Sequence, residues 1–280
     1  MHRPGRAGPG ADRDRAPALS HAIARLTAPE VAARIAAGAA ILLPLGSTET
    51  HGPAAPMGDY LLAEAIALAG AEAAKAAGDD ALVLPPLPFG GEDFFRGVPG
   101  GISLTHATLS GVIRDSLECL RAAGAGRLLI VSGHGGNIPA IEEAQRRFRE
   151  AHGQVVPVLH LWREVTPLLA GFGVPPETIG HGGNPVLGTA LHLFPELCRP
   201  WALAPRAEPG QLLGHPVSGF GTVRVGGVNL GVPVTIQEIA PGGTQATDPR
   251  GATAAHGQHI VAALAAAIRD GLAAMKEYPA

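Results

Sequence analysis

The chain has 280 residues, of which 46% are hydrophobic and 16% charged, and its formal net charge is −3 at pH 7. This length allows a large buried core, and the composition is that of a globular protein rather than a collagen-like or disordered one. Because the balance of charge is slightly acidic, it excludes the basic surface with which proteins bind nucleic acids or anionic membranes.

The beginning of the chain predicts neither a secretory signal nor a transit peptide. Residues 1–18 contain no apolar stretch and mix Arg with Asp, so we expect a disordered tail ahead of a single domain over 19–280. Cys119 and Cys198 are the two cysteines, too few for a disulfide framework, which favours a reducing, cytoplasmic compartment. The most apolar windows, 61–78 and 260–275, are interrupted by charges before the roughly 20 residues that a membrane span needs.

The next part of the chain alternates short apolar runs with longer helical runs. Strands without polar alternation, each followed by a helix, are typical of a parallel sheet that helices cover on both faces. We therefore predict an α/β fold, a three-layer α/β/α sandwich with a mostly parallel sheet. In chain order the predicted strand and helix pairs are 40–45 and 60–78, 81–87 and 105–124, 127–132 and 137–153, and 154–162 and 186–197.

The last third of the chain has a different pattern. Residues 201–249 are rich in Gly, Val and Pro and predict a small hairpin appendage or a subunit contact, and a final helix is expected over 251–278. In parallel sheets, ligands bind beyond the carboxyl ends of the strands. Chemistry is therefore expected in the loops that follow Leu45, Leu87, Ser132 and Trp162.

The first of these loops contains three side chains that can bind a metal. Glu49 and His51 are two positions apart, so both point to the same side if the segment is extended. Asp59 precedes a helix that begins near Tyr60, where it could cap the helix, bind a metal, or do both. The pattern favours a metal-binding segment, and ordinary polar loop residues are the alternative.

The pentapeptide GHGGN occurs twice, at 133–137 and at 180–184. The first copy follows a strand and opens a helix, so His134 is either a metal ligand at the sheet edge or part of an anion-binding turn. It is no P-loop, because the Lys and the Ser or Thr are missing. In the second copy, His181 could be a ligand, a proton shuttle, or a side chain in a purely structural turn.

Together these residues predict a metal centre. Glu49, His51, Asp59 and His134 form a mixed set of carboxylates and imidazoles, which suits zinc, manganese or iron rather than calcium or magnesium. An Asp59 shared by two ions would hold them roughly 3.5–4 Å apart, an arrangement that turns water into hydroxide and polarises a carbonyl. We therefore expect one or two divalent metals per chain and the hydrolysis of an amide-like bond.

Several motifs resemble those of the creatininase family of metal-dependent amidohydrolases. They are LPLGSTETHGP, Gly58-Asp59, the loop 85–109 and SGHGGN, in consistent order over approximately residues 25–275. The resemblance implies an α/β sandwich, assembly into a homo-oligomer, commonly a hexamer, and hydrolysis of small cyclic or linear amides. A small-molecule substrate is therefore the expected partner.

The resemblance also implies roles for individual residues. Glu49, Asp59 and His134 would hold one metal, and His51 and Asp59 would hold the other. Glu49 and His181 are the expected catalytic residues. Metal-bound hydroxide would attack the carbonyl while His181 assists proton transfer.

Two positions depart from the family pattern. A carboxylate normally completes the shell of the second metal, at the places that Gly136 and Val186 take here, and neither residue can bind a cation. Trp162 is a possible pocket residue or an ordinary core tryptophan, and the loop that carries Glu92 and Asp93 is either part of the pocket or a solvated surface loop. Candidate replacements for the missing ligand are Glu92, Asp93, Glu177 and His160.

The leading prediction is a metal-dependent hydrolase acting on a small amide, lactam or related C–N bond. Two alternatives follow from the same fold. The missing carboxylate at Gly136 and Val186 would suit a non-catalytic scaffold or binding protein. A hydrolase that opens the ring of a keto-sugar would use the same metal.

Overall fold

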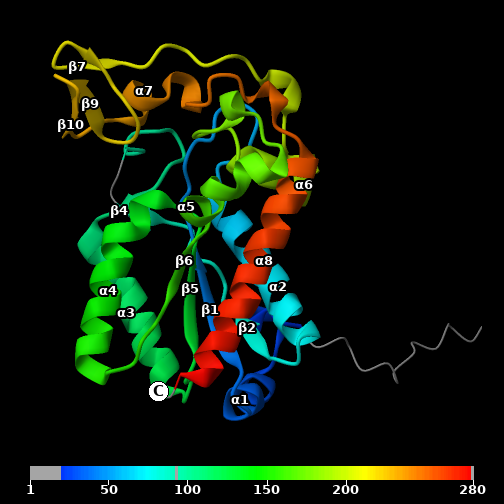
Figure 1. The fold of residues 1–280 in the computed structure, drawn as a ribbon. Helices are drawn as coiled ribbons and strands as arrows, with labels where there is room; N and C mark the ends of the chain where they lie inside the picture. Colours follow the sequence, from blue (N-terminus) through cyan, green and yellow to red (C-terminus); the bar gives the residue numbers. More distant parts are fainter. Residues whose placement is uncertain (1–19, 92–93, 279–280) are drawn as a thin grey trace, which may run out of the picture.

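The computed structural model describes residues 20–91 and 94–278, so the predicted tail, residues 1–18, lies outside the described residues. A four-stranded parallel sheet with the order β2-β1-β5-β6 forms the centre of the molecule (Figure 1). Its register pairs Ile41 of β1 with Leu128 of β5, and Ile130 of β5 with Val158 of β6. The strands are β1 (Ala40–Leu45), β2 (Ala81–Val83), β5 (Leu128–Ser132) and β6 (Val158–His160).

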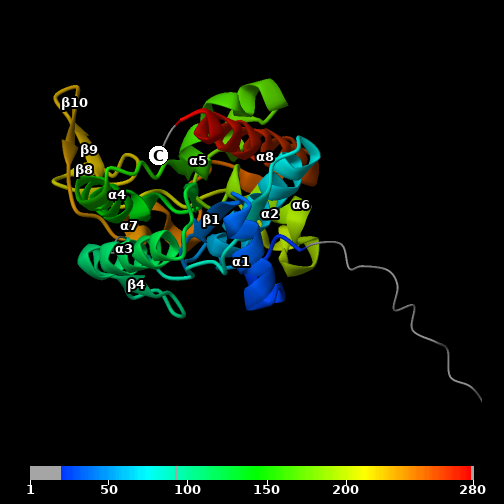
Figure 2. The same ribbon diagram turned by 90° about the horizontal axis from the view of Figure 1, so that it is seen from below.

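Helices cover both faces of this sheet, as Figures 1 and 2 show. Every residue of β1 is buried: Ile41 and Leu43 pack in the core beneath α3 and α4, and Leu42 packs in the core beneath α2 and α8. A strand buried on both faces needs no polar alternation. The predicted α/β/α sandwich is therefore confirmed. The covering helices are α2 (Asp59–Ala76), α3 (His106–Ala122), α4 (Ile138–His152) and α8 (Ala254–Glu277).

Local signals place the ends of these helices. The side chain of Thr105 accepts a hydrogen bond from the backbone N–H of Thr108 and starts α3, and Thr253 starts α8 in the same way. Gly153, with φ of 72°, ends α4 in the left-handed conformation that glycine adopts without strain. Shorter elements are α1 (Ala28–Ala36), β3 (Gly90–Gly91), β4 (Ser103–Leu104), α5 (Leu161–Val165) and α6 (Val186–Leu193).

Three predicted elements are shorter than expected. Of the predicted strand 154–162 only β6 belongs to the sheet, because Pro157 has no N–H to continue the ladder and the last two residues already belong to α5. The predicted strand 81–87 ends with β2, before two consecutive prolines. The predicted helix 186–197 ends with α6, because Pro195 follows and restricts the residue before it.

The region 201–249 forms the predicted hairpin appendage, which lies beyond the carboxyl ends of the strands (Figure 1, top). It has a small core of its own in which Val217, Val223 and Ile236 pack around Phe95. Its backbone joins the preceding loop, since Ile236 N–H donates to the carbonyl of Phe94. Its elements are β7 (Gln211–Leu212), β8 (His215–Pro216), β9 (Thr222–Val225), β10 (Val228–Gly231) and α7 (Ile236–Ile239).

Within the described residues, no helix combines the length and the apolar character that crossing a bilayer requires. This holds for α8, which contains the apolar window 260–275, and for α2, which contains most of the window 61–78.

At the opposite end of the sheet, Asp79 ties several elements together. Both its oxygens accept hydrogen bonds of 2.8 Å from Arg127, and Lys276 at the end of α8 lies 2.8 Å from Oδ1. Arg127 also donates to the carbonyl of Gly38. Burial alone would raise the pKa of Asp79, but Arg127 and Lys276 outweigh it and lower the pKa to about 2.

The substitution Asp79→Asn should lower the free energy of unfolding by about 1–2 kcal/mol at neutral pH, because it removes the charged acceptor of two cations. The folded pKa is depressed from the ordinary value of 3.8, so the stabilisation is complete above that value and is lost as the pH falls toward 2. Urea denaturation should therefore show the variant and the parent converging as the pH falls. Asp270→Asn, an exposed carboxylate beside Arg269, is the control and should change little. A difference that does not depend on pH would contradict this account.

Candidate functional site

The loops beyond the carboxyl ends of the strands enclose a cavity of about 680 Å³. Five titratable side chains that the sequence singled out line it together, although they come from segments far apart in the chain. Because β1 and β5 are paired up to Leu45 and Ser132, the loops that follow these two strands start side by side. The five side chains are Glu49, His51, Asp59, His134 and His181.

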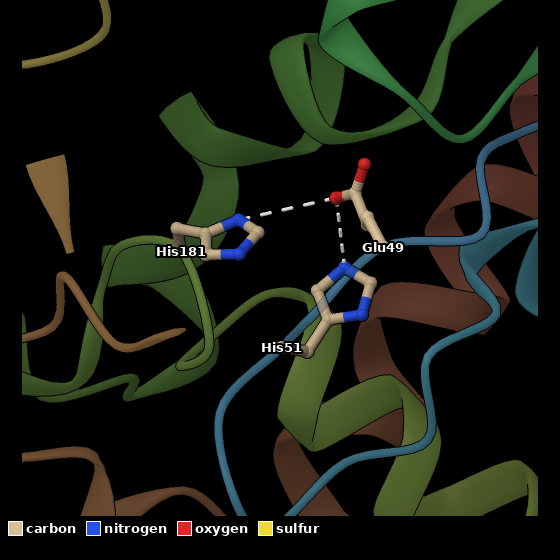
Figure 3. A group of neighbouring side chains, drawn as sticks. All are labelled: Glu49, His51 and His181. Carbon is tan, nitrogen blue, oxygen red and sulfur yellow. Dashed lines mark ion pairs between the residues drawn. The ribbon is translucent and has the colours of Figure 1, made fainter. Parts of the chain in front are cut away.

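Glu49, His51 and His181 form a first group (Figure 3). His51 Nε2 lies 3.1 Å from Glu49 Oε1, and His181 Nδ1 lies 4.0 Å from the same oxygen. The two imidazole rings are stacked, with centroids 5.0 Å apart. One ligand atom of each residue lies within 4.8 Å of the others, so the three could hold a cation. The prediction that Glu49 and His51 point to the same side is confirmed.

Glu49, Asp59 and His134 form a second group with the same potential. His134 Nδ1 lies 2.6 Å from Glu49 Oε2 and 3.5 Å from Asp59 Oδ2. The three side chains are at most 5% exposed. Glu49 therefore belongs to both groups, and each of its oxygens faces a different one.

Backbone carbonyls orient two of the imidazoles. His181 Nε2 donates to the carbonyl of Thr50 at 2.6 Å, and His51 Nδ1 donates to the carbonyl of Pro56 at 3.2 Å. Because a carbonyl only accepts, His181 Nε2 and His51 Nδ1 each carry a proton, and the other ring nitrogens, His181 Nδ1 and His51 Nε2, face Glu49. Histidines that bind metals are usually oriented by such a bond from the other ring nitrogen.

Burial and close charges shift the pKa values of the group. Burial opposes ionisation of Glu49, but His134 and His51 outweigh it and hold the pKa of Glu49 well below its usual range. Burial and the charge of Glu49 raise the pKa of Asp59 to about 6. Burial and His51 lower the pKa of His181 to about 4. At neutral pH the floor of the cavity thus combines two ionised carboxylates with a neutral His181.

Asp59 is not the N-cap of α2, which was the alternative reading of the sequence. Gly58 occupies the cap position, and Asp59 is the first residue of the helix. Asp59 Oδ1 instead accepts a hydrogen bond from the backbone N–H of Ser47, which holds the carboxylate against the end of β1.

The two GHGGN turns differ in structure. In the first, residues Gly135–Asn137 form a 3-10 helix that leads into α4, and the Asn137 side chain accepts from Gly91 N–H and donates to the carbonyl of Gly46. In the second, Asn184 donates instead to the hydroxyl of Thr178. Asn137 therefore joins three loops of the site, a role that its sequence motif alone did not indicate.

The remaining predicted residues lie in different places. Trp162 lines the cavity and also packs against the core, so both of its expected roles are met. Gly136 and Val186 line the cavity as well, where neither can ligate a cation. Glu177 and His160 are not among the described residues that line the cavity. Glu92 and Asp93 lie outside the described residues.

Aromatic side chains beside these titratable residues were not identified from the sequence as part of the site. Phe95 is 2% exposed, and its ring centroid lies 5.8 Å from that of His134 and 5.1 Å from that of His181. Phe220 of the appendage lies 5.9 Å from His181. The sequence offered a signal for Phe95, because it follows Phe94 in a Gly-rich segment. No local signal marked Phe220.

Gly46 is required where β1 meets the start of α2. A Cβ there would overlap Asp59 Oδ1 and would lie 2.5 Å from Tyr60 N. Gly46→Ala should therefore displace Asp59 and lower the free energy of unfolding by about 1–3 kcal/mol, as overpacked core positions do. Gly111→Ala in α3 is the control, because its Cβ meets nothing within 4 Å and should raise stability by about 0.5–1 kcal/mol. Urea denaturation measures both, and shifts of the same sign would contradict the crowding at Gly46.

Comparisons with known proteins show what this chain is similar to. The model of the family described as "Creatininase: Creatinine amidohydrolase" matches residues 24–272. The creatinine amidohydrolase of Pseudomonas putida is 35% identical over 196 residues, which are 62% of this chain and 72% of that protein. The mycofactocin precursor peptide peptidase of Mycobacterium tuberculosis (strain ATCC 25618 / H37Rv) is 32% identical over 234 residues, 80% of each chain. A shorter match of 38% over 108 residues covers 37% of this chain and 42% of the peptidase of the same name from Mycolicibacterium smegmatis.

Solved structures share the fold. A mutant creatininase of Zn-Zn type has a TM-score of 0.73 and 27% identity, covering 94% of this chain and all (100%) of that one. A structure named "Creatininase Mn" has a TM-score of 0.73 and 28% identity over the same shares. The family resemblance of the motifs is thus confirmed along most of the sequence. The chain belongs to the creatininase family.

Proposed function

We propose that the protein is a metal-dependent hydrolase that cleaves the C–N bond of a small amide, lactam or related compound. The observation that carries this proposal is the ionised Glu49 carboxylate, buried under the cavity and facing two groups of ligand atoms. Membership of a family of amide hydrolases supports it. A divalent cation, when bound, supplies a Lewis acid that activates water at neutral pH and polarises a carbonyl.

The residues fit such a cation. Glu49 Oε2 is buried, yet no donor among the described residues is placed to hydrogen-bond it, even though His134 Nδ1 is close. Burying an ionised carboxylate is costly unless a positive charge compensates it. We propose Glu49, His51, Asp59 and His134 as the ligands, a donor set that suits zinc, manganese or iron.

His181 is proposed to move the proton rather than to hold the metal. Its Nδ1 lies 4.0 Å from Glu49 Oε1, farther than the 3.1 Å of His51 Nε2. The carbonyl of Thr50 holds Nε2–H, and the low pKa keeps Nδ1 free to accept a proton from water and to return it to the departing nitrogen. Glu49 is proposed to orient that transfer, because its Oε1 faces a nitrogen of each of the two rings.

His134→Ala or removal of metal with a chelator should lower turnover of a small amide by about 100-fold or more and leave the fold intact. His181→Ala should lower turnover equally while the metal content stays at the parent value. Turnover of a panel of amides and lactams, elemental analysis and circular dichroism measure these effects. An unchanged rate in metal-free protein would refute the mechanism, and loss of metal from His181→Ala would make His181 a ligand.

Two carboxylates are candidates for the ligand that two ions share. The family resemblance implies Asp59, whereas Glu49 is the residue common to both groups of ligand atoms and one oxygen of Asp59 already accepts from Ser47. We propose that Glu49 would be the ligand common to both sites. The alternative with Asp59 stays a prediction of the resemblance.

Elemental analysis of two variants separates these assignments. With Glu49 shared, Glu49→Gln should lose all bound metal, whereas Asp59→Asn should keep one of two ions. The reverse result would assign the shared role to Asp59. Glu177→Gln, an exposed carboxylate outside the cavity, is the control and should keep the metal content of the parent.

A non-catalytic scaffold or binding protein is the second candidate function. Gly136 and Val186 favour it, because they line the cavity at the places where the family resemblance implies a carboxylate. Such a protein would contain no stoichiometric transition metal after purification without chelators and would turn over no amide.

A further inference from the structure

The walls of the cavity differ in chemistry from its floor. Above the ligands the lining is mainly apolar and aromatic, and it includes Phe94, Phe95, Phe220, Trp162, Ile179 and Val186. A cavity of about 680 Å³ lies in the range that holds drug-sized ligands, far above the need of a single small ring. A matching substrate therefore has an apolar part beyond its scissile bond.

Fixed positive charge is missing from the described part of the lining. None of the described residues that line the cavity is Lys or Arg, while Glu49 and Asp59 contribute negative charge to the floor. A carboxylate on the distal part of a substrate would lose its water without gaining a charged partner. The walls therefore favour an uncharged distal group.

Phe220 stands at the mouth of this cavity. It lies in the turn that precedes β9 and is 46% exposed. Its ring centroid lies 5.3 Å from that of Phe94 and 5.9 Å from that of His181. Its ring meets His181 edge-on, with an interplanar angle of 78°. A large aromatic ring that lines a cavity and is nearly half exposed offers a face on which a flat ligand can stack.

We propose that the substrate is an uncharged amide bearing a planar aromatic group, and that Phe220, supported by Phe94, is the residue that selects that group. The inference rests on the proposed function, because the amide itself would lie on the floor at Glu49 and His181. Apolar character alone would be satisfied by any aliphatic group, whereas the edge-on and tilted aromatic contacts around Phe220 favour a flat one.

Binding of matched amides tests the proposal without requiring turnover. Acetanilide has a flat ring on the amide nitrogen, and N-cyclohexylacetamide has a puckered ring of similar size at the same place. Benzamide and cyclohexanecarboxamide form a second flat and puckered pair, in which the ring is attached to the carbonyl carbon. Calorimetry with the metal-loaded full chain should show the flat member of at least one pair binding about five- to tenfold tighter. Phe220→Ala should reduce that preference to within about twofold, and Phe220→Leu should do the same while keeping the wall apolar.

Leu230→Ala, an exposed apolar residue of the same appendage that does not line the cavity, is the matched control and should keep the preference. Equal affinity for flat and puckered rings in both pairs, no measurable binding of any of the four, or a preference that survives Phe220→Ala would overturn the proposal. The outcome is separate from that of the proposed function. A ring preference that depends on Phe220 in a protein that cleaves no amide would refute the hydrolase and leave this binding site in place.

Discussion

The site depends on the burial of one ionised carboxylate, Glu49, at the end of a central strand. Ion desolvation in a protein interior costs several kcal/mol, so the charge persists only where partners are held close. The imidazoles of His51, His134 and His181 come from three separate segments and all face the two oxygens of Glu49. These segments are therefore positioned around the same charge, and His51 and His134 are the two that stabilise it.

The sandwich supplies the rigidity that this arrangement needs. The parallel register of β1 and β5 starts two of the loops side by side, and the helices on both faces bury every residue of these two strands. Asn137 then joins the loops by hydrogen bonds to Gly46 and Gly91. The precision of the site thus comes from secondary structure below it and from one buried amide within it.

The architecture could be predicted from the sequence because strands that are buried on both faces leave continuous apolar runs, as in 40–45 and 127–132. Element ends were predicted less well, since Pro157 and Pro195 interrupt patterns that hydrophobicity alone would continue. Of the site, the two-residue spacing of Glu49 and His51 was sufficient to predict their common direction.

Other features of the site depend on tertiary structure and had no local signal. The two GHGGN turns have the same letters, yet Asn137 bridges loops while Asn184 bonds to a neighbouring threonine. Side-chain direction, rather than order in the chain, decides whether Glu49 or Asp59 faces both groups of ligand atoms. Phe220 reaches the cavity from a segment almost forty positions beyond His181, and no periodicity connects the two.

The separate small core of the appendage affects where amino-acid substitutions can accumulate in such a protein. Val217 and Val223 pack within the appendage rather than in either core of the sandwich, and the turn between them carries Phe220. That surface turn lies outside the sheet and outside the segments that carry Glu49, His51, Asp59 and His134. Substitutions at the entrance of the cavity can thus occur without altering the segments that form its floor.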